Sequence, residues 1–80
     1  MNDEINFLIE WCPVCNQGWI EIVKDKNSKE LFVYCNECET EWASPEYIKI
    51  KDSGTFGNYG EIESPAYEEI LKKGWDKFLQ

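Results

Sequence analysis

Histidine and arginine are both absent from this sequence, and each absence narrows the classes of function open to the chain. Histidine is the usual general acid or base at neutral pH, so a chain without it has little support for proton-transfer catalysis. Paired carboxylates occur at Glu61/Glu63 and Glu68/Glu69, but in so acidic a sequence they are interpreted as surface charge. We therefore expect a protein that is not an enzyme.

Basic residues are scarce, because eight lysines stand against 16 acidic residues and give a formal net charge of -8. Nucleic-acid-binding domains need a basic face to neutralise phosphates, so we expect no direct contact with DNA or RNA. No apolar run is long enough to span a membrane. The glycines of residues 52–60 lack the lysine and hydroxyl residue of a phosphate-binding motif, so this segment is predicted to be a plain glycine-rich loop.

Four cysteines stand in two pairs of identical spacing, Cys12/Cys15 and Cys35/Cys38, with 19 residues between the pairs. Each Cys-x-x-Cys pair can turn the backbone so that both sulfurs face one ion, and we call the two turns knuckle 1 and knuckle 2. Four thiolates at this spacing form a tetrahedral cage for zinc. The sequence therefore predicts one structural Zn²⁺ per chain, since a cage of four protein ligands leaves no open position for water.

Other chemistries can use the same cysteines. Iron can be held by four thiolates, and it is the less favoured metal. A disulfide framework suits a secreted chain, but residues 1–4 are acidic where an export signal would be basic, so we expect a cytoplasmic protein. A redox centre of the thioredoxin type would use one Cys-x-x-Cys pair at the mouth of a βαβ unit, whereas this chain has two pairs.

The length of the chain also favours a metal. Residues 1–80 are expected to form a single domain, and an apolar core of that size supplies roughly 3–5 kcal/mol of net stability. A structural zinc ion contributes on the order of 10–16 kcal/mol of apparent binding free energy, much of which becomes folding free energy. We therefore expect a metal-stabilised domain that is largely unfolded without its metal.

Two kinds of pattern predict the strands. Residues 5–11 alternate between apolar and polar and lead into knuckle 1. Residues 19–24 are rich in β-branched and aromatic side chains, a polar run follows, and residues 31–34 then lead to Cys35, which predicts a hairpin between the knuckles. Ser44 and Pro45 indicate a turn, and residues 48–51 alternate again, which predicts a further short strand.

A second Ser-Pro, at Ser64 and Pro65, predicts the C-terminal helix. Gly74 either ends that helix at Lys73 or weakens its interior. Large aromatic side chains are expected to fill the core, with Trp42 beside the metal. Besides Trp42, the other three tryptophans are also assigned to the core: Trp11, Trp19 and Trp75. The helix carries one apolar stripe, formed by Tyr67, Ile70, Leu71, Trp75, Phe78 and Leu79.

The two knuckles, the hairpin between them and a third strand after knuckle 2 resemble the zinc-ribbon family, which includes rubredoxins, over roughly residues 10–50. The resemblance implies a small α+β domain: residues 5–51 form a zinc ribbon of antiparallel strands with an N-terminal strand, and residues 61–80 form a C-terminal helical extension. The sequence departs from the common knuckle because Asn16 and Glu39 stand where glycine usually follows. Members serve in transcription, in ribosomes and in electron transfer, so the family does not fix the function.

Charge indicates a partner surface. From residue 30 to residue 48 the sequence has five acidic residues and no basic one. Such a stretch is either a solvated acidic surface or a docking face for a basic protein, in which carboxylates steer the partner and an aromatic side chain anchors it. The candidate partner-binding residues are Glu37, Glu39, Glu41, Trp42, Glu46 and Tyr47.

These observations favour a non-catalytic, zinc-binding protein-interaction module. Its most specific form is a bacterial immunity protein or antitoxin, whose acidic surface covers a basic toxin such as a nuclease. Two other classes remain: a rubredoxin-like iron electron carrier, and a zinc-ribbon accessory subunit of the transcription or translation machinery.

Overall fold

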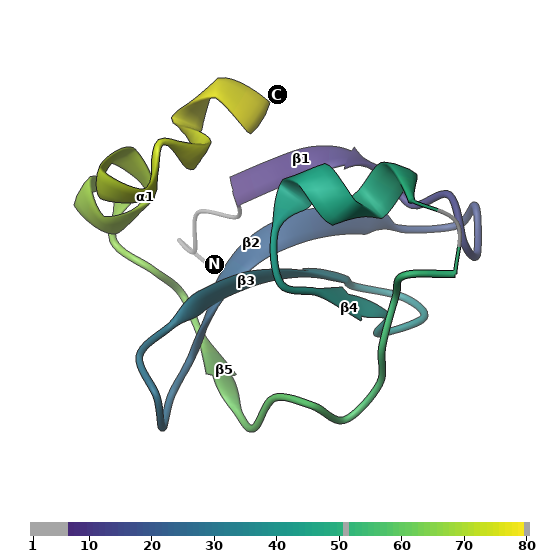
Figure 1. Ribbon diagram of the computed structural model, residues 1–80, viewed down its shortest axis with the longest axis horizontal. Coiled ribbons are helices and arrows are strands. Elements are labelled where there is room, and N and C mark those ends of the chain that lie inside the picture. Colours follow the sequence, from purple (N-terminus) through teal and green to yellow (C-terminus); the bar gives the residue numbers. More distant parts are fainter. Residues whose placement is uncertain (1–6, 51, 80) are drawn as a thin grey trace, which may run out of the picture.

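An antiparallel sheet forms the centre of the molecule (Figure 1). The structure is a computed structural model that describes residues 7–50 and 52–79, so the predicted strand residues 5, 6 and 51 and the last residue of the predicted helical extension lie outside the described residues. Within that part of the chain the strand order is β1-β2-β3-β4, and β5 pairs with β2. The strands are β1 Phe7–Trp11, β2 Trp19–Asp25, β3 Leu31–Cys35, β4 Glu41–Trp42 and β5 Ile62–Glu63.

The predicted hairpin between the knuckles is confirmed by β2 and β3. Ile20 lies opposite Cys35 and Ile22 lies opposite Val33, so the apolar positions of both strands face the same side of the sheet. The hairpin turn is closed by Asp25, whose carboxylate accepts a hydrogen bond from the backbone N–H of Asn27 at 2.9 Å. This strand pair carries knuckle 2 at its far end.

The predicted strand over residues 48–51 is wrong, because the segment Pro45–Lys49 is a 3₁₀ helix, η1. Ser44 caps it by accepting a hydrogen bond from the N–H of Glu46 at 3.4 Å, and the N–H of Ile50 donates back to the carbonyl of Tyr47. Ile48 is buried and Ile50 is exposed, whereas a strand would place both on one face.

The C-terminal helix is shorter than the apolar stripe indicates. The α-helix α1 spans Tyr67–Lys73 and ends at Gly74, which has φ 74° in the left-handed region, and the 3₁₀ helix η2 spans Trp75–Phe78. Gly74 therefore ends the helix, the first of its two predicted roles. The stripe divides accordingly: Ile70 is buried with Trp75, whereas Tyr67 and Leu71 are exposed.

The main core lies between one face of the sheet and the helical segments η1, α1 and η2. Trp75 is buried there as predicted, but Trp11 is 45% exposed and packs edge-on against the half-buried Trp19, so its assignment to the core is wrong. A smaller contact lies outside this cluster, where Tyr59 stacks on the buried Phe32 with ring centroids 3.9 Å apart. The fold is thus a small α+β domain with one antiparallel sheet.

Candidate metal centre

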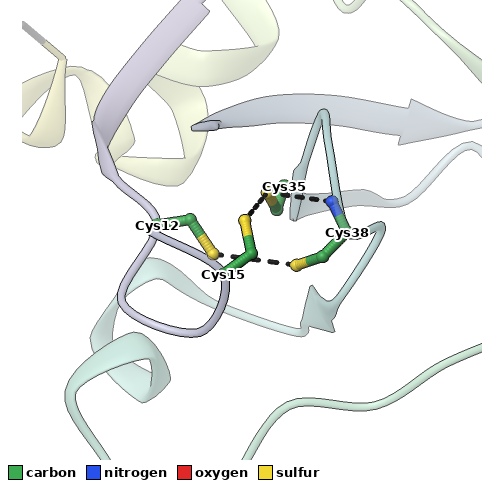
Figure 2. Close-up of side chains that lie close together, drawn as sticks. All are labelled: Cys12, Cys15, Cys35 and Cys38. Carbon is green, nitrogen blue, oxygen red and sulfur yellow. Dashed lines mark hydrogen bonds between the residues drawn. The ribbon is translucent and has the colours of Figure 1, made fainter. Parts of the chain in front are cut away.

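Two matching turns bring the four cysteines together (Figure 2). Knuckle 1 follows β1, and knuckle 2 begins at the last residue of β3. In each knuckle the residue after the second cysteine donates its N–H to the carbonyl of the first cysteine: Asn16 to Cys12 at 3.1 Å, and Glu39 to Cys35 at 3.0 Å. Asn16 and Glu39 have φ of 56° and 62°, so both adopt the left-handed conformation for which glycine is the common residue.

The sulfur atoms have the spacing of a tetrahedral metal site. The four Sγ atoms lie within 4.8 Å of one another, with 3.8 Å between Cys12 and Cys38 and 3.6 Å between Cys15 and Cys35. A metal–sulfur distance of about 2.3 Å in a tetrahedron requires sulfurs about 3.8 Å apart. All four cysteines are free, and a disulfide would bring two sulfurs to about 2.05 Å. This group can hold a metal ion.

Hydrogen-bond donors surround the sulfurs. The N–H groups of Glu37 and Cys38 lie 3.3 and 3.4 Å from the Sγ of Cys35, and the N–H of Val14 lies 3.4 Å from that of Cys12. The hydroxyl of Thr40 lies 3.2 Å from the Sγ of Cys38. Donors aimed at sulfur stabilise the thiolate and orient it toward a cation.

The four thiols are not equivalent in acidity. Burial raises the pKa of Cys12, and it raises the pKa of Cys35 to about 12. Burial also opposes ionisation of Cys38, but hydrogen bonds from the side chain and backbone of Thr40, and then from Cys35 and Cys15, outweigh it and lower the pKa of Cys38 to about 7. A site with two buried cysteines therefore needs a cation before all four sulfurs can be thiolates.

Three residues that the Cys-x-x-Cys pattern does not identify also support the site: Gly18, Thr40 and Gly54. A Cβ atom at Gly18 would lie 2.7 Å from the Cγ of Glu37, so glycine lets the two knuckles approach closely. A Cβ atom at Gly54 would collide with the methyl group of Thr40. The position of Thr40, two residues after a cysteine, is a signal that could have identified it as a partner of sulfur.

The predicted partner-binding residues divide into two groups. Glu37 and Glu39 are exposed in knuckle 2, and Glu46 and Tyr47 are exposed on η1. Glu41 and Trp42, by contrast, are buried, with exposures of 8% and 2%.

The prediction that Glu41 and Trp42 belong to an exposed partner-binding surface is therefore wrong. Glu41 accepts hydrogen bonds from the hydroxyl of Thr55 at 3.2 Å and from the N–H of Asn58 at 3.1 Å. Trp42 packs in the core cluster that contains Cys12 and Cys35, in agreement with its predicted place beside the metal. Glu39 is exposed whereas Glu41 is buried, because Glu39 lies in a left-handed turn and Glu41 lies in β4.

No family model and no solved structure matches this chain. The chain is 36% identical over 45 residues to uncharacterized protein L48 of Acanthamoeba polyphaga mimivirus, an alignment that spans 52% of this chain and 38% of the viral protein. This similarity assigns neither a family nor a function. Among the described residues, no helix is long and apolar enough to cross a membrane.

Proposed function

We propose that this chain is a non-catalytic protein-binding module of the zinc-ribbon type, held together by one structural zinc ion. The observation that carries the proposal is the group of four cysteine sulfurs at tetrahedral spacing, supplied by two matching turns. Four protein ligands leave a bound zinc no position for water or substrate, and the sequence has no histidine to act as a base.

Metal analysis of the purified chain tests the first part of this proposal. One zinc per chain is the expected ratio, and removal of the zinc with a chelator should abolish the near-ultraviolet circular dichroism of the tryptophans, because the metal supplies much of the folding free energy. A red protein with one iron per chain would support a rubredoxin-like electron carrier instead. Two disulfides by mass spectrometry would contradict any metal site.

The second part concerns the partner, which we propose to be a basic protein that meets this chain in the cytoplasm. The formal net charge of -8 and the exposed carboxylates of Glu37, Glu39 and Glu46 favour a cationic partner and disfavour nucleic acid. The ring of Tyr47, which follows Glu46 on η1, is also exposed and offers an aromatic anchor.

The most specific form of this proposal is an immunity protein or antitoxin that covers the cationic surface of a toxin such as a nuclease. Co-purification with the tagged chain from its native host tests it. A basic toxin in a stoichiometric complex is the expected result. Recovery of a polymerase or ribosomal component would support the accessory-subunit alternative.

A further inference from the structure

Phe56 is the most exposed of the large apolar side chains in the described part of the chain, at 67%. It belongs to the loop of residues 53–60, which follows η1 and returns to β5 at the tip of the β2–β3 hairpin (Figure 1). Two backbone hydrogen bonds between Thr55 and Glu41 attach this loop to β4 at 2.8 and 2.9 Å. The loop thus holds Phe56 in a defined place without burying it.

Phe56 borders two hollows of the surface. The first, which we call the apolar hollow, has a volume of about 510 Å³ and contains two further exposed apolar side chains, Val14 and Ile50. Trp42 and Ile48, which belong to the main core, also line it, together with three charged residues, Glu10, Lys49 and Asp52. Exposed apolar side chains gathered around one hollow are typical of an interaction site.

The second hollow has a volume of about 410 Å³ and combines aromatic rings with carboxylates; we call it the acidic hollow. Among the described residues, no lysine lines it. Four aromatic residues and three glutamates contribute to its lining: Phe32, Tyr34, Phe56, Tyr59, Glu39, Glu41 and Glu61.

The electrostatic potential of the acidic hollow is negative at Tyr59. Burial raises the pKa of this phenol, and the charges of Glu41, Glu30 and Asp25 raise it further. Lys26 lies at the edge of this region, where its Nζ is 4.0 Å from Glu61 in an exposed ion pair. An exposed pair of this length contributes little, so an incoming cation can compete with Lys26 for Glu61.

Arginine matches the chemistry of the acidic hollow. Its planar guanidinium stacks on aromatic faces and donates to carboxylates at the same time, and it is less strongly hydrated than an ammonium group. A free cation, however, would leave Val14 and Ile50 of the apolar hollow uncovered. An occupant with an arginine and a neighbouring apolar side chain satisfies both hollows.

We propose that the two hollows together bind a short segment of a protein partner, with an arginine in the acidic hollow and an adjacent apolar side chain in the apolar hollow, on either side of Phe56. This inference rests on the proposed function, because it assumes a basic protein partner. It adds a further contact, at Phe56, and the chemistry of that contact.

Nuclear magnetic resonance with matched peptides tests the inference on the purified, metal-loaded chain. The probes are acetyl-Leu-Arg-Leu-amide, acetyl-Leu-Gln-Leu-amide and acetyl-Ala-Arg-Ala-amide. The first peptide should shift the amide signals of Phe56, Gly57 and Tyr59, and each of the other two should bind about tenfold more weakly, because each lacks one of the two anchors. Equal binding of all three peptides, or no shift of these signals, would overturn the inference.

Substitutions at exposed positions locate the site. Phe56→Ala should weaken the first peptide about tenfold, and Glu61→Gln should weaken it less and reduce its dependence on salt. Leu71→Ala and Glu68→Gln on α1 are matched controls, because they remove an exposed apolar side chain and an exposed carboxylate outside both hollows. If either control lost more affinity for the first peptide than Phe56→Ala or Glu61→Gln does, the inference would be overturned.

Two further measurements separate this inference from the proposed function. The metal content and melting temperature of each variant show whether the module itself is intact, because Phe56 is exposed and lies outside the metal site. Signals of Phe56 and Gly57 that move with protein concentration, in the absence of peptide, would show that a second copy of the chain occupies the hollows and would overturn the proposed occupant. Zinc binding without peptide binding would overturn the inference and leave the zinc module standing.

Discussion

At the scale of single residues, the metal site depends on side chains that never touch the metal. Thr40 is buried and directs its hydroxyl at the sulfur of Cys38, the cysteine whose pKa is lowered to about 7. Cys38 is therefore the thiol that ionises most readily of those with a shifted pKa, and Cys12 and Cys35 ionise with more difficulty because they are buried. We therefore expect Cys38 to be the first of these three sulfurs to bind an incoming ion.

Thr40→Val tests this role, because valine keeps the shape of threonine and removes the hydroxyl. The affinity for zinc should fall about tenfold, as expected when a ligand loses a supporting hydrogen bond. Competition with a chromogenic chelator measures the change. Thr40→Ser is the control, since it retains the hydroxyl and should lie near the wild type. Equal zinc affinity of Thr40→Val and the wild type would show that the hydroxyl has no part in metal binding.

At the scale of elements, two of the three glycines in the loop of residues 53–60, Gly54 and Gly57, are needed for different reasons. Gly57 has φ 70° and open space around its Cβ position, so Gly57→Ala should cost about 1 kcal/mol of stability through backbone strain. Gly54 faces the methyl group of Thr40, so Gly54→Ala should displace Thr40 and lower zinc affinity as well as the melting temperature. Chelator competition and thermal melts of both variants check this difference. The prediction would be contradicted if Gly57→Ala lowered the affinity for zinc and Gly54→Ala did not.

The ion pair between β2 and α1 gives an element-scale prediction about pH. Lys24 Nζ lies 2.8 Å from a carboxylate oxygen of Glu69, and this hydrogen bond is the main cause that lowers the pKa of Glu69 from its ordinary value of 4.5. A lowered pKa in the folded state means that the stabilisation is present above about pH 4.5 and is lost as the pH falls through the folded value.

Glu69→Gln should therefore melt at a lower temperature than the wild type at neutral pH, and the difference should shrink as the pH falls below about 4.5. Melts of both proteins in excess zinc measure this difference at each pH. Glu68→Gln, next to Glu69 but exposed, is the control and should show no such trend. A difference that stays constant into the acid range would mean that the pair contributes nothing through its charge.

The elements also show which parts of the fold can be predicted from the sequence. The hairpin was predictable because β2 is rich in β-branched and aromatic residues and a short polar turn joins it to the apolar residues of β3. The strand β5 was not predictable, since it is two residues long and exists through its pairing with Lys24 and Asp25, far away in the sequence. Around η1, the spacing of Ile48 and Ile50 matches the pattern of a strand, whereas Ser44 caps a 3₁₀ helix that ends before Ile50.

The candidate site divides in the same way. The spacing of the cysteines predicted a group of four sulfurs because each turn is local and needs few residues. The burial of Glu41 could not be predicted, because it depends on Thr55 and Asn58 of a loop that pairs with β4 from far away in the sequence. Local sequence patterns therefore predict the metal ligands, whereas the exposure of neighbouring side chains depends on contacts with residues far away in the sequence.

At the scale of the whole molecule, charge is expected to control association. The carboxylates of Glu37 and Glu39 are exposed at knuckle 2, and the net charge of the chain is strongly negative. Long-range attraction between opposite charges mainly raises the association rate and makes it depend on salt. Replacing Glu37 and Glu39 with lysine should therefore slow association with the co-purified basic partner about tenfold and reduce its salt dependence.

A control with the same change in net charge separates local from global electrostatics. Glu68→Lys combined with Asp76→Lys places the same two reversals on α1 and η2, where both positions are exposed. If the surface beside knuckle 2 is the docking face, this control should retain most of the association rate. Tyr47→Ala should instead raise the dissociation rate, because it removes an aromatic contact and leaves the charge unchanged. Stopped-flow kinetics at several salt concentrations measures all three variants. Equal slowing by both lysine pairs would mean that net charge alone steers the partner, and the carboxylates beside knuckle 2 would then be ordinary solvated surface.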